Sequence, residues 1–293
     1  MSETIQVRVL TTPDEMRAAE ELQTIVWQAN PLDIVPGHLT LAISHNGGVV
    51  AGAFDGQKLV GLVIGFIGTD AKSPGRVAMA RLKHYSHELA VHPDYRNRGI
   101  GYALKLAQRE LVMMQGIRLI SWTYDPLLSV NAHLNIRRLG AICSTYIKNN
   151  YGEMRDELNL GDESDRFHVE WWITSKRVET RLTNERKPLD LAHFLSAGAE
   201  KVNPTILDSR DLLLPSEQIY MPEGTFALVE IPPDYHKLRS IDPGLAESWR
   251  EQIREIFTEL FKRGYLVTDF VHLHEERYPR SYYLLSYGEG TLG

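Results

Sequence analysis

A glycine loop between a predicted strand and a predicted helix points most directly to chemistry. The loop is Arg96-Asn97-Arg98-Gly99-Ile100-Gly101, and it follows Pro93, which cannot donate to a strand ladder. Glycines let backbone amides approach a ligand closely, and the first turn of a helix directs free N–H groups and the positive end of its dipole the same way. The sequence therefore predicts an anion site here, most simply for a pyrophosphate.

The elements on either side of this loop must hold it in place. A strand is expected over Leu82–Val91, and a helix from residue 102 until Gly116 ends it. Residues 117–124 are predicted to be a second strand. Because a full helix separates the two strands, we expect them to be parallel. The apolar residues at helical spacing that predict the inner face of the helix are Leu104, Ala107, Leu111 and Met114.

The rest of the first 176 residues predicts a mixed α/β (α+β) fold, with a central sheet flanked by helices. Alternating apolar residues indicate a strand at 5–10, and Thr12-Pro13-Asp14-Glu15 is typical of the start of a helix, here with Met16, Leu22, Ile25 and Val26 inward. Asp55-Gly56 predicts a hairpin between two strands. A short helix capped by Ser129 or Asn131 and strands at 141–149 and 166–175 complete this part.

Three parts are predicted along the chain: 1-176, a connector at 177-204, and a smaller α/β region at 205-293. The last part contains a strand at 226–231, a helix at 245–263, and strands at 265–271 and 281–285. One ordered pattern occurs twice, at 89–124 and at 228–271: a strand, the tripeptide Pro-Asp-Tyr, a helix, a glycine and a second strand. This indicates either a degenerate copy that lacks the glycine loop or two unrelated β-α-β pieces with a chance tripeptide.

Composition excludes several classes of protein. The chain has 293 residues, of which 43% are apolar, so it can bury a substantial core. A net charge of −6 gives no electrostatic support for a nucleic-acid partner. The single cysteine, Cys143, excludes an internal disulfide and a cysteine-rich zinc site. No signal peptide or run of ~18 apolar residues is found. We therefore expect a cytoplasmic protein with no metal, no membrane and no nucleic acid.

Two motifs in this chain resemble those of the GNAT acyltransferase superfamily. The first is Arg96-x-x-Gly99-x-Gly101 after Val91-His92-Pro93-Asp94-Tyr95, and the second is Asn131-Ala132 with a short helix that ends at Leu139-Gly140. The resemblance covers about residues 5–175 in the family's order of elements. It looks closer still to a little-characterised two-part subgroup suspected of amino-acid N-acylation. The stretches that carry this finer resemblance are Gln108-Arg109-Glu110, 122–127 and 131–136.

The resemblance implies an acyl-coenzyme A, such as acetyl-CoA or succinyl-CoA, as co-substrate. Amides of the glycine loop would bind its pyrophosphate, and the end of the preceding strand would pair with pantetheine like an added strand. An amide near Ala90 or Val91 would stabilise the oxyanion, and Asn131 would form a second wall. The cofactor-binding residues that the resemblance implies are Leu89, Ala90, Val91, Arg96, Asn97, Arg98, Gly99, Ile100, Gly101, Tyr102 and Asn131.

The implied reaction needs a base, because an amine must be neutral to attack a thioester. Glu88 and His87 are the candidates, with a water relay as an alternative. On a regular extended strand His84 and Glu88 would face one way, and Tyr85 and His87 the other.

One departure from the family concerns the general acid. Many superfamily members carry a tyrosine four residues before the glycine of the second motif, where this chain has Ile136. Tyr124 and Tyr146 are the alternative acids, and unassisted departure of the thiolate is a third option.

We therefore predict an N-acyltransferase that transfers a small acyl group to a small-molecule amine or amino acid by direct attack in a ternary complex. One cofactor site per chain is expected, and a homodimer is one arrangement that apolar strands and paired tryptophans permit. Two alternatives stay open. One is an acyl-CoA-binding sensor without turnover, which Ile136 favours, and the other is a protein lysine acyltransferase.

Overall fold

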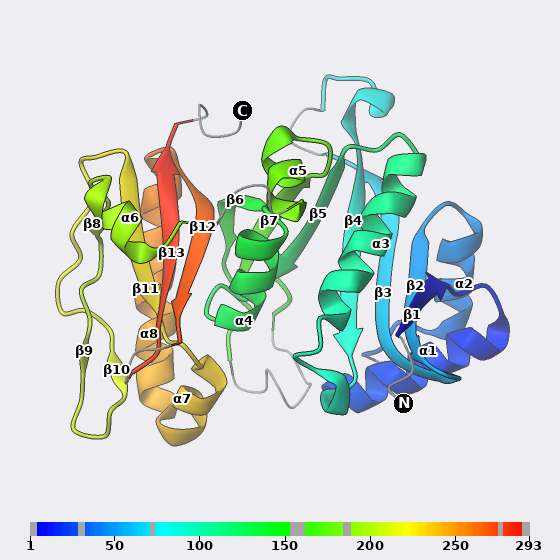
Figure 1. The fold of residues 1–293 in the computed structure, drawn as a ribbon, viewed down its shortest axis with the longest axis horizontal. Coiled ribbons are helices and arrows are strands. Elements are labelled where there is room, and N and C mark those ends of the chain that lie inside the picture. The colour runs from blue at the N-terminus through cyan, green and yellow to red at the C-terminus, as the bar shows by residue number, and fades with distance from the viewer. Residues whose placement is uncertain are drawn as a thin grey trace. The chain divides into compact units, whose positions relative to one another are not determined.

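A computed structural model of the protein describes residues 5–28, 33–70, 74–152, 162–183, 189–274 and 278–288. These residues divide into two compact units, whose elements are labelled in Figure 1. One unit reaches to Trp122, and the other comprises Thr123–Gly152 and the described residues from Glu163 onward. Each unit is a sheet with helices, so the predicted mixed α/β class is confirmed. The predicted domain limits at 1-176, 177-204 and 205-293 stay a prediction.

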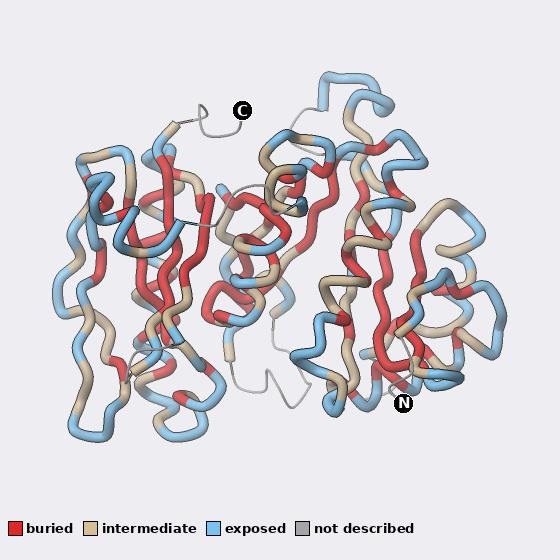
Figure 2. Tube along the Cα trace, viewed as in Figure 1, coloured by how far each residue is buried: buried red, intermediate tan, exposed pale blue. Residues whose placement is uncertain are grey.

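The first unit is built on neighbouring strands in chain order. They are β1 (Gln6–Val9), β2 (Val49–Asp55), β3 (Lys58–Thr69), β4 (Leu82–Val91) and β5 (Leu119–Tyr124, up to Trp122). The first four are antiparallel to their neighbours, whereas β4 and β5 are parallel, as predicted. Asp55 and Gly56 join β2 to β3 in the expected hairpin, with Gly56 at φ 58°. β2 and β3 are buried along most of their length (Figure 2).

Helices α1 (Pro13–Trp27) and α2 (Gly37–His45) cover one face of this sheet, and α3 (Ile100–Met114) covers the other (Figure 1). Thr12 and Glu15 form the predicted capping box of α1. Ile25, expected to face inward, is 46% exposed, so that expectation is wrong. The core under α1 includes Leu10, Met16, Leu22, Val26, Val50, Leu62, Ile64 and Ala90.

The buried side of α3 differs from the predicted one. Its buried residues are Ile100, Leu104, Lys105, Gln108 and Val112, whereas Met114 is 77% exposed. The pattern of apolar residues alone was misleading because two of the buried positions are polar, and this shifts the inner stripe around the helix. Two short 3₁₀ turns, Ala78–Arg81 and Pro93–Tyr95, precede β4 and α3.

In the second unit the paired strands occur in the order β7, β6, β12, β13, β11, β8. Their bounds are β6 (Ile142–Ile147), β7 (Arg166–Trp172), β8 (Glu200–Lys201), β11 (Phe226–Ile231), β12 (Tyr265–Leu273) and β13 (Arg280–Tyr287). A separate pair joins β9 (Ile206–Leu207) to β10 (Leu213–Leu214). The helices are α4 (Ser129–Ala132), a π-helical turn (His133–Arg138), α5 (Lys176–Leu182), α6 (Leu191–Ser196), α7 (Tyr235–Ile241) and α8 (Pro243–Lys262).

Helix α8 supplies much of the core of the second unit. All five residues predicted to face inward are fully buried: Trp249, Ile253, Ile256, Phe257 and Leu260. Phe257 packs edge-on against Phe167 of β7, with ring centroids 4.7 Å apart, and against Tyr283 of β13 at 5.3 Å. Such edge-to-face contacts are the preferred geometry of aromatic pairs.

Two predictions for the second unit are wrong. Neither Ser129 nor Asn131 caps α4, because the N-cap residue is Leu128 and it makes no side-chain capping bond. The proposed repeat also fails on strand order. β4 pairs directly with β5, whereas β13 lies between β11 and β12. The segment 177–204, predicted to be a connector, contains α6, β8 and all of α5 except Lys176, and its limits stay a prediction.

Among the described residues no helix is both long and apolar enough to cross a membrane.

Candidate functional site

A β-bulge in β4 decides where the candidate bases point. Ile64 of β3 is opposite Glu88, and the next residue, Gly65, is opposite Ser86, so His87 is the extra residue. A bulge reverses the alternation of side chains beyond it. The expectation that His84 and Glu88 share a face is therefore wrong. His84 is fully buried on the side of α3, where its ring contacts Gln108.

Beyond the bulge, Glu88 lies on the face that α1 covers. It is paired with Ile64, which belongs to the core under α1. The rings of Tyr85 and His87 also lie together with Phe66 of β3, at centroid distances of 5.6 to 6.4 Å. The bulge thus gathers one carboxylate, one imidazole and one phenol on a single face.

The carboxyl group of Glu88 is suited to accept a proton near neutral pH. Its side chain is 17% exposed, and its Oε2 atom is buried without a hydrogen-bond partner. Its Oε1 atom lies 3.8 Å from His87 Nε2. Burial raises the pKa of Glu88 to about 7, because desolvation disfavours the charged form.

His87 is the more accessible of the two candidate bases, since its side chain is 40% exposed. Partial burial lowers its pKa below the usual value, so the ring is neutral at physiological pH. His87 can therefore act as an acceptor itself or hold a water next to Glu88.

The edge of β4 that faces β5 is only partly paired. Within the described chain, β5 pairs with β4 at His84 and Tyr85, opposite Ile120 and Ser121. The rest of β4, including Leu89–Val91, pairs with β3 on its other edge. A strand edge of this kind offers main-chain donors and acceptors to an extended ligand.

The glycine loop leads from this edge into α3. Gly99 is the N-cap residue of α3 with φ 77°, and no side chain caps the helix. Asn97 also has a positive φ of 62°. A Cβ atom built at Gly99 meets no other atom within 4 Å, so the space in front of the helix is open. Arg96, Asn97, Arg98 and Gly99 are exposed, Gly101 and Tyr102 are half-buried, and Ile100 is 3% exposed.

Packing fixes both ends of the loop. Ile100 lies under it against Gly61 of β3, where an added Cβ would come within 2.8 Å of the isoleucine side chain. Before the loop, the Tyr95 hydroxyl donates to Asp55 Oδ2 at 2.8 Å, and the Arg98 guanidinium lies 4.9 Å from the centre of the Tyr95 ring. The exposed amides are thus held on a rigid base.

The remaining predicted site residues belong to the second unit. Tyr124 is buried with its hydroxyl 3.2 Å from that of Tyr283, and burial raises its pKa well above the usual value. Asn131 is half-buried in α4, and Ile136 is fully buried. The roles of Tyr124 and Asn131 stay predictions.

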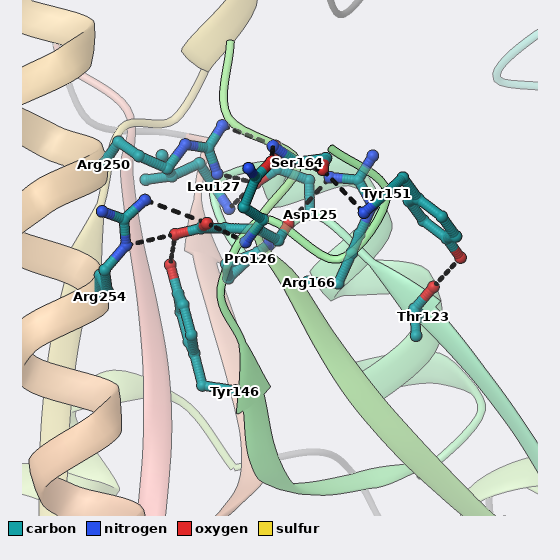
Figure 3. Close-up of polar contacts among 12 residues, drawn as sticks. Thr123, Asp125, Pro126, Leu127, Tyr146, Tyr151, Ser164, Arg166, Arg250 and Arg254 are labelled. Atoms are coloured by element: carbon teal, nitrogen blue, oxygen red, sulfur yellow. Dashed lines mark hydrogen bonds and ion pairs between the residues drawn. The ribbon is translucent and has the colours of Figure 1, made fainter. Parts of the chain in front are cut away.

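Figure 3 shows the polar cluster that holds Asp125 and Tyr146 in this unit. Arg250 donates to both carboxylate oxygens of Asp125 at 2.7 Å, and Asp125 also accepts from the amide of Leu127. The Tyr146 hydroxyl donates to Asp165 at 2.6 Å. These groups are occupied by internal contacts, which gives Asp125 a structural function as a turn cap and ion-pair partner.

Residues 14–133 match the model of the Acetyltransferase (GNAT) family. This part of the chain is thus similar to the GNAT acetyltransferase family. The match contains the glycine loop, the whole of β4 and the start of the second motif at Asn131-Ala132, whereas the end of that motif at Leu139-Gly140 lies beyond it.

Several solved structures resemble the chain at low identity. The ribosomal-protein-S18-alanine N-acetyltransferase of Escherichia coli is 16% identical, covering 58% of this chain and 94% of its own, with a TM-score of 0.44. Naa20 of Chaetomium thermophilum, in complex with a bisubstrate analogue, is 14% identical, covering 60% and 90%, with a TM-score of 0.45. YncA of Salmonella typhimurium, with its cofactor acetyl-CoA, is 14% identical, covering 58% and 94%, with a TM-score of 0.44. No curated protein matches.

No group of three or more His, Cys, Asp or Glu residues in the described part of the chain is arranged to hold a metal ion. What the sequence analysis missed is the bulge at His87 and the burial of Lys105. Gly65, a glycine inside a strand, is the one sequence signal that could have indicated the bulge.

Proposed function

We propose that the protein is an acyl-CoA-dependent N-acyltransferase that transfers a small acyl group, acetyl or succinyl, to a primary amine. The observation that carries this is Glu88: a carboxyl group with a pKa of about 7, no partner for one oxygen, and a place on a bulge beside an unpaired strand edge. A GNAT segment with a base poised at neutral pH is equipped for proton abstraction from an ammonium group.

The residues present fit an acyl-CoA. The open N-terminus of α3 at Gly99 suits a pyrophosphate, because unpaired amides and the helix dipole both favour an anion. Amides from Asn97 to Tyr102 would hold that group, with Arg96 and Arg98 adding positive charge. The free edge at Leu89–Val91 would pair with pantetheine through main-chain hydrogen bonds.

When bound, acyl-CoA supplies an activated thioester. Glu88 takes a proton from the acceptor's ammonium group, directly or through a water held by His87, and so frees the nitrogen lone pair. The amide of Ala90 or Val91 donates to the oxyanion that develops when the new C–N bond forms. As the C–S bond breaks, the negative charge goes to the sulfur.

We propose an amino acid or another small amine as acceptor. The test is release of free thiol from acetyl-CoA or succinyl-CoA in the presence of free amino acids, polyamines, an aminoglycoside or a lysine peptide. Turnover with a small amine that Glu88→Gln removes supports the proposal. Preference for the lysine peptide would instead indicate a protein acyltransferase. Tight binding of acyl-CoA with no turnover on any acceptor would indicate a sensor.

A further inference from the structure

A buried lysine on α3 is not used by the reaction described above. Lys105 is 2% exposed. Its Nζ atom lies 2.7 Å from Ser86 Oγ, 3.3 Å from Gln108 Oε1 and 3.8 Å from the centre of the Trp122 ring. No ion pair of Lys105 is found within the described ranges. Burying an amine without a counter-ion costs stability that a leucine at the same position would not.

The place of this amine in the sheet is specific. β4 and β5 pair at His84 and Tyr85, and the next residues along the two strands are Ser86 and Trp122. Lys105 contacts both of them. Its amine therefore sits at the vertex where the two parallel strands cease to pair.

The surroundings of the vertex are polar and closely packed. His84 Nε2 lies 3.2 Å from the Gln108 amide nitrogen, while His84 Nδ1 and Ser121 Oγ are buried without a hydrogen-bond partner. Gly65 leaves room for this cluster, because an added Cβ would come within 2.2 Å of the His84 ring. Burial lowers the pKa of Lys105 to about 7.

Ser86 connects this cluster to the candidate base. It is the last residue before the bulge at His87, and it is opposite Gly65, where the register of β3 and β4 shifts. A bond that fixes Ser86 on the α3 side therefore also fixes how far the chain rotates before Glu88 emerges on the α1 side.

We propose that Lys105 is a positioning residue of the transferase site, which holds the β4–β5 vertex and the β4 bulge so that Glu88 faces the acceptor. This role rests on the proposed function. It assigns to a buried amine what a hydrophobic side chain could not do, namely to donate a hydrogen bond to Ser86 of one strand while it packs on the ring of Trp122 in the other.

The test compares Lys105→Met, which removes the amine and keeps an unbranched side chain one atom shorter, with Lys83→Met, the same change at another lysine of the first unit, on β4. Calorimetry gives the concentration of sites that bind acyl-CoA, and turnover is divided by that concentration. A variant that folds less well is then not mistaken for one that is less active. For Lys105→Met we expect kcat to fall about 100-fold, with a KM for acyl-CoA within about threefold of wild type. In a profile of kcat against pH, the apparent pKa of the acid limb should fall from about 7 toward the ordinary value of a carboxyl group, because Glu88 is no longer held in its buried position. Lys83→Met should match wild type.

Ser86→Ala removes the hydroxyl that Lys105 contacts, and it tests the same contact if Lys105→Met does not fold. It should lower kcat about tenfold, and the double variant should be no worse than Lys105→Met, because both act through one contact. Turnover within threefold of wild type in the folded variants, with an unmoved acid limb, would overturn the role of Lys105. Wild-type protein that neither binds nor turns over acyl-CoA would instead refute the proposed function, and the role of Lys105 with it.

Discussion

The same tripeptide, Pro-Asp-Tyr, precedes a helix in both units, with opposite results. In the first unit Asp94 is exposed and Gly99 is the N-cap residue of α3, without a side-chain cap. In the second unit Asp234 accepts a hydrogen bond from the amide of Lys237 at 3.0 Å and caps α7. A helix start that its own carboxylate occupies has no room for an anionic ligand, whereas an open one attracts it. The difference lies in where the helix begins: α7 begins at Tyr235, directly after Asp234, whereas α3 begins at Ile100, within the glycine loop.

Two glutamates on strands differ in the same way. Glu230 of β11 is 2% exposed and accepts from Arg280 at 2.7 Å and from Thr205 at 2.6 Å. Glu88 of β4 has one buried oxygen without a partner. A paired buried carboxylate stabilises the fold, and an unpaired one is available for proton transfer. The two helix starts and the two glutamates thus differ in whether their polar groups are satisfied internally.

Glu88→Gln gives the largest expected effect. Without the base, kcat/KM should fall about 10²- to 10⁴-fold. In wild type the rate should rise with pH through an apparent pKa of about 7, because only the ionised carboxylate accepts a proton. The variant should lack this limb in a pH profile of thiol release. Glu230→Gln is the matched control and should keep turnover within threefold. A limb near pH 7 that persists in Glu88→Gln would show that another group is the base.

Gly99→Ala should weaken acyl-CoA binding about 10- to 100-fold, since the displaced loop loses a charge-assisted hydrogen bond to the phosphate. Gly116 at the other end of α3 is the control. Its φ of 74° matches the 77° of Gly99, and neither glycine has an atom within 4 Å of a built Cβ. Alanine should cost about 1–2 kcal/mol of stability at either position. Only the Gly99 variant should change the affinity measured by calorimetry. Equal affinity in both variants would remove the anion site.

The two glutamates should also differ in their effect on stability. The raised pKa of Glu88 means that the folded state binds the proton more tightly than the unfolded state, so stability falls as pH rises from 4.5 toward and past 7. At pH 8 the free energy of unfolding of Glu88→Gln, measured with urea, should therefore exceed that of wild type by about 3 kcal/mol, and below pH 4.5 the two should match. Glu230→Gln should be less stable than wild type at pH 8, because Arg280 loses its partner. A destabilised Glu88→Gln at pH 8 would contradict the comparison.

Asp234→Ala removes the cap of α7 and has the smallest expected effect of these variants. Loss of the cap on α7 should cost about 1 kcal/mol in urea unfolding. Acyl-CoA affinity and turnover should not change. A change in affinity would mean that the capped start of α7 takes part in binding the cofactor.

Local patterns predicted most of the elements well. The bounds of β4 and β11, the capping box of α1 and the inner face of α8 followed from periodicity and capping residues, since each depends on neighbours in the chain. The inner face of α3 could not be predicted in this way, because Lys105 and Gln108 are polar residues at buried positions. The strand order of the second unit could not be predicted from local patterns either. β13 lies between β11 and β12, and this depends on pairing between strands that are far apart in the chain.

By itself the sequence determined the glycine loop, the strand before it and the similarity of residues 14–133 to the GNAT acetyltransferase family. It also named Glu88 and His87 as candidate bases. Only the tertiary structure decided their surroundings. The extra residue in β4 exists only relative to β3, and it alone turns Glu88 away from His84 and toward α1. Likewise, the environment that raises the pKa of Glu88 and buries Lys105 is made by residues distant in the chain, whose desolvation no local pattern records.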